Sequence, residues 1–202
     1  MTSMLEPMRL SAILTLLLLL SPSLFSEDRE LVSNWEKATE LSLSGNHESA
    51  IEVLNAMVNQ HPDDVQICVK RSGEYLRLKN FKLASRDIYH ALSIDPESID
   101  ANIALIFLYK ETNRIKLAYE LLNTLSYDGK PDRNRVLYHC SAFTLFIKNN
   151  DIEKAKLTGL ELIKMKSNNP FIQKWLMHDK DFDPVRKQEW FIEIINSLPN
   201  GP

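Results

Sequence analysis

The fold is decided by residues 99–132, which read IDANIALIFLYKETNRIKLAYELLNTLSYDGKPD. Apolar side chains recur in this stretch in two runs, each at the spacing of an α-helix. The runs consist of Ile103, Leu105, Ile106 and Tyr109, followed by Leu117, Leu121, Leu122 and Leu125. Asn113 stands between them, where a tight turn needs a residue that tolerates a left-handed backbone. The stretch therefore predicts a helix-turn-helix unit.

The unit recurs with a fixed period along the chain. Ala50, Ala84 and Ala118 are spaced by 34 residues, and Ala155 follows three residues late because of an insertion around Gly129. The same interval of 34 links Leu41, Tyr75 and Tyr109, then Leu54, Ile88 and Leu122, then Met57, Ala91 and Leu125. Such a period is the signature of stacked helix pairs. We place the repeats at 31–64, 65–98, 99–132 and 136–169.

Two details of the repeats have a direct physical explanation. The small alanine at position 20 allows the second helix of each unit to approach the first closely. Pro62 and Pro96 follow the second helices of the first two units, because a residue before proline avoids the helical conformation. Gly45 stands at the same turn position in repeat one as Asn113 does in repeat three.

The pattern resembles the tetratricopeptide repeat family. The residues that carry the resemblance are the position-20 alanines, the terminal prolines, the small or apolar residue at position 27, and a large residue at position 11, namely Leu41, Tyr75, Tyr109 and Phe146. The family's tryptophan at position 4 and glycine at position 8 are missing, and Gly159 stands where a bulky residue is expected. The resemblance spans all four units and implies an all-α, right-handed solenoid.

The last part of the chain, 170–202, is predicted to form a helical cap. A short helix around Trp175 is followed by an Asp-rich stretch and by an amphipathic helix with Trp190 and Phe191. The open end of a solenoid must hide its apolar surface under such a segment. The alternative is that Trp190 and Phe191 anchor a partner.

The N-terminal residues 1–26 have the order of a secretory signal peptide. Arg9 precedes an apolar run from Leu10 to Leu20, Pro22 interrupts the run, and Ser26 supplies a small residue for cleavage. The run is shorter than the roughly 20 residues that cross a bilayer. We therefore predict cleavage near Ser26 and a single domain, 27–202, that is periplasmic or secreted.

Two alternatives remain open at this end. Cleavage after Ser23 is the second choice, and an uncleaved signal anchor would tether the protein to the membrane. Membrane contact is expected only in that second case. The sequence contains no Asn-x-Ser/Thr acceptor, which favours a bacterial envelope over a eukaryotic secretory route.

Composition and motifs exclude several function classes. Lys and Arg number 24 against 27 Asp and Glu, without a basic run, so no nucleic-acid partner is expected. The five histidines are scattered, and Cys68 and Cys140 fall on first helices two repeats apart, too far for a disulfide. Acidic residues near helix starts are expected to be caps rather than calcium ligands. We predict no enzyme activity, cofactor, metal or small-molecule substrate.

A binding surface is what the resemblance implies instead. In the family, positions 2, 5, 9, 12 and 13 of each first helix line a concave groove. The predicted partner-binding residues are Trp35, Val69, Leu76, Arg77, Ile103, Phe107 and Lys110. One subclass uses a lysine and an asparagine to clamp a terminal carboxylate, and this chain has Trp35 and Thr39 there, so that clamp is absent.

Trp35 and Phe107 are the expected anchors, because buried aromatic side chains dominate interface energetics. They could instead pack between neighbouring first helices or under the N-terminal segment. We predict a non-catalytic module that binds a peptide or protein segment in the groove. The alternative is a structural subunit or assembly factor of a membrane-associated complex that uses the convex face or the cap.

Overall fold

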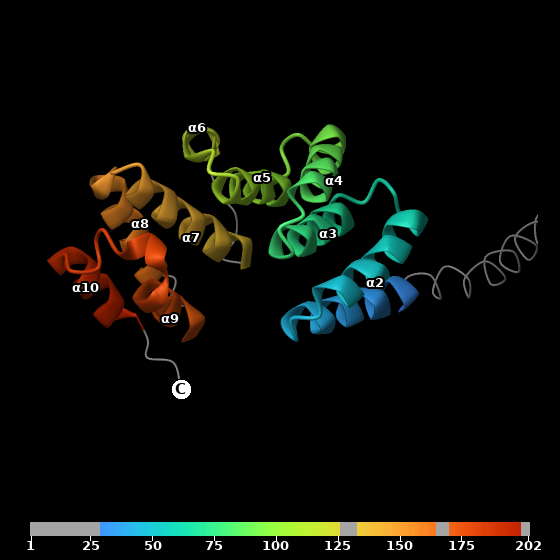
Figure 1. Ribbon diagram of the computed structural model, residues 1–202, viewed down its shortest axis with the longest axis horizontal. Helices are drawn as coiled ribbons and strands as arrows, with labels where there is room; N and C mark the ends of the chain where they lie inside the picture. The colour runs from blue at the N-terminus through green and yellow to red at the C-terminus, as the bar shows by residue number, and fades with distance from the viewer. Residues whose placement is uncertain (1–28, 126–132, 165–169, 199–202) are drawn as a thin grey trace, which may run out of the picture. The chain divides into compact units, whose positions relative to one another are not determined.

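The computed structural model describes residues 29–125, 133–164 and 170–198, and these residues form an all-α fold (Figure 1). The predicted signal peptide lies outside the described residues. A first helix covers residues 29–43. It is followed by α2 (His47–Gln60), α3 (Val65–Arg77), α4 (Phe81–Ile94), α5 (Ile99–Glu111), α6 (Ile115–Thr124), α7 (Arg133–Lys148), α8 (Ile152–Lys164), α9 (Pro170–His178), the 3₁₀ helix η1 (Lys180–Phe182) and α10 (Glu189–Ser197). The predicted all-α fold is confirmed.

The chain divides into two compact units between Pro62 and Asp63. In the first unit, the helix at 29–43 and α2 form one pair. Its core consists of Ala38, Ala50, Leu54 and Met57, which are fully buried. This unit corresponds to repeat one of the sequence.

In the second unit, helices pack as sequential pairs: α3 with α4, α5 with α6, and α7 with α8. Each later first helix also packs against the preceding pair, since α5 contacts both α3 and α4, and α7 contacts both α5 and α6. The first helices α3, α5 and α7 therefore lie side by side. Gln66 Nε2 donates to Asp100 Oδ2 at 2.8 Å, which joins the same repeat position on α3 and α5.

The turns inside the four helix pairs share one backbone conformation. Gly45 has φ of 81°, and Lys79, Asn113 and Asn150 have φ of 56°, 58° and 57°. All four occupy the same repeat position. In each turn the following amide donates to the carbonyl of the position-11 residue, as Asn46 N does to Leu41 O at 2.8 Å. The turn predicted at Gly45 and Asn113 is thus also present at Lys79 and Asn150.

The helix boundaries agree with the sequence signals. Ala50, Ala84, Ala118 and Ala155 are all fully buried between the paired helices. The helices α2 and α4 end at Gln60 and Ile94, directly before the His-Pro and Asp-Pro steps. Asp64 caps α3 by accepting from Ile67 N at 3.0 Å, as expected for an acid at a helix start.

Gly159 departs from the family pattern because α10 packs against it. A Cβ at Gly159 would collide with Ile194 Cδ1 and lie 3.0 Å from Phe143 Cε2. The glycine therefore makes room on α8 for the last helix. Phe191 of α10 is fully buried, and its ring stacks on Phe143 with centroids 6.0 Å apart. These contacts are those of a cap.

Candidate protein-binding surface

A strip of side chains runs over α3 and α5, on the face where the sequence predicts a groove. Val69, Leu76, Phe107 and Lys110 are half-buried, and Arg77 is exposed. Ile103 is only 4% exposed, so it packs between helices and offers little surface. We call the remaining set, together with Gly73, the α3–α5 strip: Val69, Gly73, Leu76, Arg77, Phe107 and Lys110.

Gly73 lies at the centre of this strip on α3. A Cβ built there meets no atom within 4 Å, so the space above the glycine is open. Phe107 occupies the equivalent position on α5, one period of 34 residues later. Because α3 packs against α5, the open space on one helix and the half-buried aromatic ring on the next are suited to receive an apolar side chain. Gly73 is position 9 of repeat two, one of the groove positions that the resemblance implies, but a helical glycine gives no sign in the sequence of the space around it.

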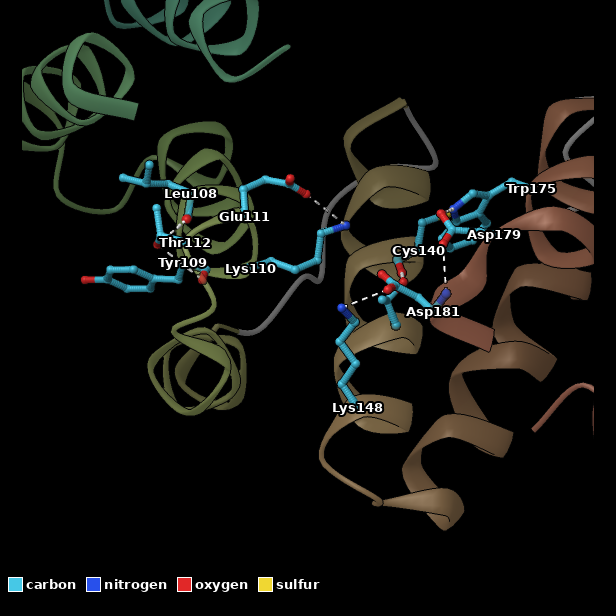
Figure 2. A network of polar contacts seen from close by, with 11 residues as sticks. Leu108, Tyr109, Lys110, Glu111, Thr112, Cys140, Lys148, Trp175, Asp179 and Asp181 are labelled. Carbon is cyan, nitrogen blue, oxygen red and sulfur yellow. Dashed lines mark hydrogen bonds and ion pairs between the residues drawn. The ribbon is translucent and has the colours of Figure 1, made fainter. Parts of the chain in front are cut away.

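Lys110 covers one side of Phe107. Its Nζ lies 5.3 Å from the ring centroid and 3.8 Å from Glu111 Oε1, and its side chain is 17% exposed. Figure 2 shows Lys110 extending from α5 towards α7. A cation over an aromatic face is attracted by the ring quadrupole, so the ammonium helps to hold Phe107 in place.

Arg77 provides the free charge of the strip. Within the described part of the chain its guanidinium makes no ion pair or side-chain hydrogen bond. Arg77 lies four residues after Gly73, one turn along the same face of α3. A carboxylate carried by a partner can reach it without displacing an internal contact.

A buried ion pair joins α3 to α4. Arg71 donates to Asp87 of α4 through Nε at 2.6 Å and Nη2 at 2.9 Å. Both side chains are buried, at 10% and 3% exposure. A bidentate pair of this kind fixes one helix against its neighbour. It therefore sets the orientation in which α3 presents Gly73 and Leu76.

The strip stops at α7, because the chain itself covers the same positions in repeat four. Thr144 and Ile147 are 1% and 6% exposed, and η1 packs on α7. Lys148 Nζ pairs with Asp181 Oδ1 of η1 at 2.8 Å (Figure 2). Asp179 caps η1 and accepts from Trp175 Nε1 at 3.1 Å. The cap was predicted from the sequence, but its packing over the first helix of repeat four was not.

Cys140 shows that the junction between α5 and α7 is not built for nucleophilic chemistry. Burial raises the pKa of its thiol to about 12, and the positive charge of Lys110 opposes this only in part. The thiol is therefore protonated at neutral pH and is a poor nucleophile. Cys68 is also a buried thiol with a raised pKa, first of all because of burial.

Trp35 lies in the first unit. It is half-buried on the helix at 29–43, and its carbonyl accepts from Thr39 Oγ1 at 2.8 Å. The other six predicted binding residues lie on α3 and α5 of the second unit. The structure thus brings together six of the predicted positions, and Ile103 is the buried one.

The described residues offer neither a metal site nor a membrane-spanning helix. These residues hold no group of three or more His, Cys, Asp or Glu side chains that could bind a metal ion. In the same part of the chain, no helix has the length and apolarity needed to cross a bilayer.

Comparison with solved structures identifies the architecture. A mutant of MamA, a protein with tetratricopeptide repeats, matches with a TM-score of 0.51 and 14% identity, over 86% of this chain and 99% of that chain. The fold is TPR-like. A second MamA structure, MamA AMB-1, matches with a TM-score of 0.51 and 13% identity, over 84% of this chain and 99% of that chain. At this identity the likeness concerns the TPR-like fold alone. No family model and no curated protein matches the chain.

Proposed function

We propose that the protein is a non-catalytic binding module that docks a segment of a partner protein on the α3–α5 strip. The observation that carries the proposal is the open space above Gly73 on α3, with the half-buried Phe107 at the equivalent repeat position of α5, the helix that packs against α3. TPR-like folds position such surfaces on rigid, side-by-side helices. The buried pair of Arg71 and Asp87 supplies that rigidity for α3.

The strip suggests how the partner is held. An apolar side chain of the partner enters the space above Gly73 and contacts Leu76 and Phe107. Such a desolvated anchor contributes most of the binding energy at a protein interface. A carboxylate of the partner pairs with Arg77 at the rim, where charge adds more to specificity and association rate than to affinity.

The proposed compartment is extracytoplasmic, periplasmic or secreted, after cleavage near Ser26. It rests on the order of charge, apolar run and small residues in 1–26. Mass spectrometry of the mature chain tests it. An N-terminus at Glu27 supports cleavage, whereas an N-terminus at Met1 or Thr2 supports a membrane-tethered form.

The docking site is tested by filling the space above Gly73. Gly73→Trp places an indole there, and Gly73→Ala adds only a methyl group as the matched control. Both proteins are immobilised beside the wild type, and partners are captured from an envelope extract. We expect one protein to be retained by the wild type and by Gly73→Ala but not by Gly73→Trp or Phe107→Glu. Equal retention by all four proteins contradicts docking on the strip.

A second candidate function, that of a structural subunit, is favoured by an exposed apolar pair on α8. Leu157 and Leu160 on α8, the second helix of repeat four, are 64% and 48% exposed and lie three residues apart on one side of the helix. An exposed apolar pair on a second helix fits a structural subunit that assembles through its convex face. Loss of retention in Leu157→Gln/Leu160→Gln, with retention kept in Gly73→Trp, would favour this alternative.

A further inference from the structure

The outer side of α8 carries two exposed leucines. Leu157 and Leu160 are 64% and 48% exposed. Ala155, Thr158 and Leu162 lie on the opposite side of the same helix and are buried. With its buried side α8 packs against α7 and α10 (Figure 1). The side with the two leucines stays exposed within the described part of the chain, and large apolar side chains left in this state mark a site of interaction.

Opposite charges stand at the two ends of this leucine pair. Glu153 lies four residues before Leu157, and Lys164 lies four residues after Leu160. Successive intervals of four, three and four residues bring these four side chains to one face of the helix. The side chains of Glu153 and Lys164 are 83% and 69% exposed. We call these four residues the α8 face.

Each charge of the α8 face has a neighbour of opposite sign on the same helix. Lys156 Nζ lies 3.0 Å from Glu153 Oε1, and Lys164 Nζ lies 2.7 Å from Glu161 Oε1. Such pairs on an exposed helix surface contribute little to stability, so their charges can also serve an outside partner. Lys154 is directed elsewhere, because its Nζ donates to a tyrosine hydroxyl of α6 at 3.2 Å.

We infer that the α8 face is a self-association site, on which α8 of a second copy of this chain packs in the antiparallel direction. A two-fold axis through the middle of α8 places Leu157 of one copy against Leu160 of the other. It also places Glu153 against Lys164 at both ends. The contact is isologous, because both copies use the same residues. In the parallel direction acid would face acid and base would face base, which disfavours that arrangement.

The sequence of the α8 face favours a second copy over other occupants. The order acid, leucine, leucine, base becomes its own complement when it is reversed, and a second copy supplies that reversed order. With Lys156 and Glu161 this side of α8 carries two acids and two bases, so it attracts neither a basic peptide nor an anionic lipid surface. The inference gives the exposed leucines one occupant, and it does not rest on docking over the α3–α5 strip.

Sedimentation velocity of the purified protein measures the self-association. One helix against one helix is a small interface, so we expect a reversible dimer that forms between about 5 and about 500 µM. The dimer should weaken as salt rises from about 50 to about 300 mM. Leu157→Gln is expected to weaken it about tenfold or more, because the change enters the interface on both copies. Leu117→Gln, at a leucine of α6 that is 43% exposed, should leave it unchanged.

An exchange of charges tests the antiparallel direction. Glu153→Lys brings two lysines together at each end of the dimer, and Lys164→Glu brings two glutamates together. Each variant alone should self-associate about fivefold more weakly or worse. A mixture of the two should form heterodimers as strong as the wild-type dimer, because every end again joins a lysine to a glutamate. Fluorescein on Glu153→Lys reports the heterodimer in sedimentation. Lys116→Glu, whose side chain on α6 is 89% exposed, is the control and should associate with Glu153→Lys less tightly than Lys164→Glu does.

Several results would overturn the inference. A monomer at every concentration, or wild-type association of Leu157→Gln, would show that the α8 face does not self-associate. A mixture no stronger than its single variants would exclude the antiparallel contact, and species larger than a dimer would exclude a closed two-fold contact. A benzophenone amino acid at position 157 should crosslink two copies of this chain through α8, and mass spectrometry separates that product from an adduct with another protein. None of these outcomes depends on a partner at the α3–α5 strip. Circular dichroism confirms that each variant is folded.

Discussion

Two helical glycines in the second unit have opposite surroundings. The Cβ position of Gly73 on α3 meets nothing within 4 Å, whereas the Cβ position of Gly159 on α8 is occupied by Ile194 and Phe143. The first glycine leaves a space at the surface, and the second lets α10 pack against the repeats. The same residue type thus marks an open surface over α3 and α5, and a closed one at the end of the repeats.

The closed end follows from how the repeats terminate. Phe182 and Phe191 are fully buried, and both rings pack near Phe143 of α7, at centroid distances of 5.7 and 6.0 Å. Burying apolar surface at the end of a stack stabilises it. The surface over α3 and α5 is different, because Phe107 and Leu76 remain half-buried there. Side chains left in this state are available for a partner.

The largest expected contrast is in stability. Phe191→Ala removes a fully buried ring and should lower the free energy of unfolding by about 3–5 kcal/mol. Phe107→Ala removes a half-buried ring and should cost only about 1 kcal/mol. Urea denaturation followed by circular dichroism measures both. A cost for Phe107→Ala as large as that of Phe191→Ala would show that Phe107 is a core residue rather than part of a binding strip.

The two glycines give the next contrast. Gly159→Leu forces a side chain into the space of Ile194 and should destabilise the protein by about 1–3 kcal/mol through overpacking. Gly73→Leu enters open space and replaces a helical glycine, so it should stabilise the protein by up to about 0.8 kcal/mol. Thermal unfolding of the two variants is compared. Destabilisation by Gly73→Leu would mean that the space over α3 is filled.

The reactivity of Cys140 gives a chemical measure of the junction between α5 and α7. Burial holds its pKa at about 12, above its value in an unfolded chain, so folding disfavours the thiolate. Stability from this group is present below the unfolded pKa of about 8.5 and declines as the pH rises above it. Iodoacetamide at pH 8 should modify Cys140 slowly in the native protein and rapidly in urea. The Cys68→Ser variant isolates the signal, and rapid native labelling would contradict a tightly closed junction.

The smallest expected effect concerns the joint between repeats three and four. Tyr119 donates to Asp151 Oδ2 at 2.8 Å. Desolvation acts to raise the pKa of Asp151, but the hydrogen bonds from Tyr119 and Lys154 outweigh it, and the pKa lies below its ordinary value. A lowered carboxyl pKa adds stability above the unfolded pKa of about 3.9, which is lost as the pH falls through the folded value.

Asp151→Asn removes this contribution. Its unfolding free energy should therefore fall less steeply than that of the wild type as the pH is lowered from about 5 towards 2. Parallel curves for the two proteins would show that the bond between Tyr119 and Asp151 does not couple the repeats.

The repeat architecture could be predicted from the sequence because its signals are local and periodic. The buried alanines at Ala84 and Ala118 and the helix ends before the prolines follow from spacing and backbone chemistry. The left-handed turn at Lys79 was not predicted, because a lysine gives no sign of a positive φ, whereas Asn150 carries the same signal as Asn113. Their position in the period was the available signal.

The candidate site was predictable only in part, because burial depends on contacts distant in sequence. Val69, Leu76 and Phe107 lie half-buried where the resemblance implied, but Ile103 is covered. Ile147 on α7 is 6% exposed, and η1, which packs on α7, lies more than thirty residues later in the chain. The sequence showed that Gly159 departs from the family pattern. The explanation for the glycine depends on Ile194, whose side chain occupies the space that a Cβ would need.

The central claim is that a partner docks over α3 and α5, and site-specific photo-crosslinking tests it most directly. A benzophenone amino acid is placed at position 73 in one full-length protein and at the exposed position 157 of α8 in another. After irradiation in an envelope extract, adducts are identified by mass spectrometry. The account predicts a specific partner adduct from position 73 and none from position 157. An adduct formed only from position 157 would contradict it and assign the function to the second helices.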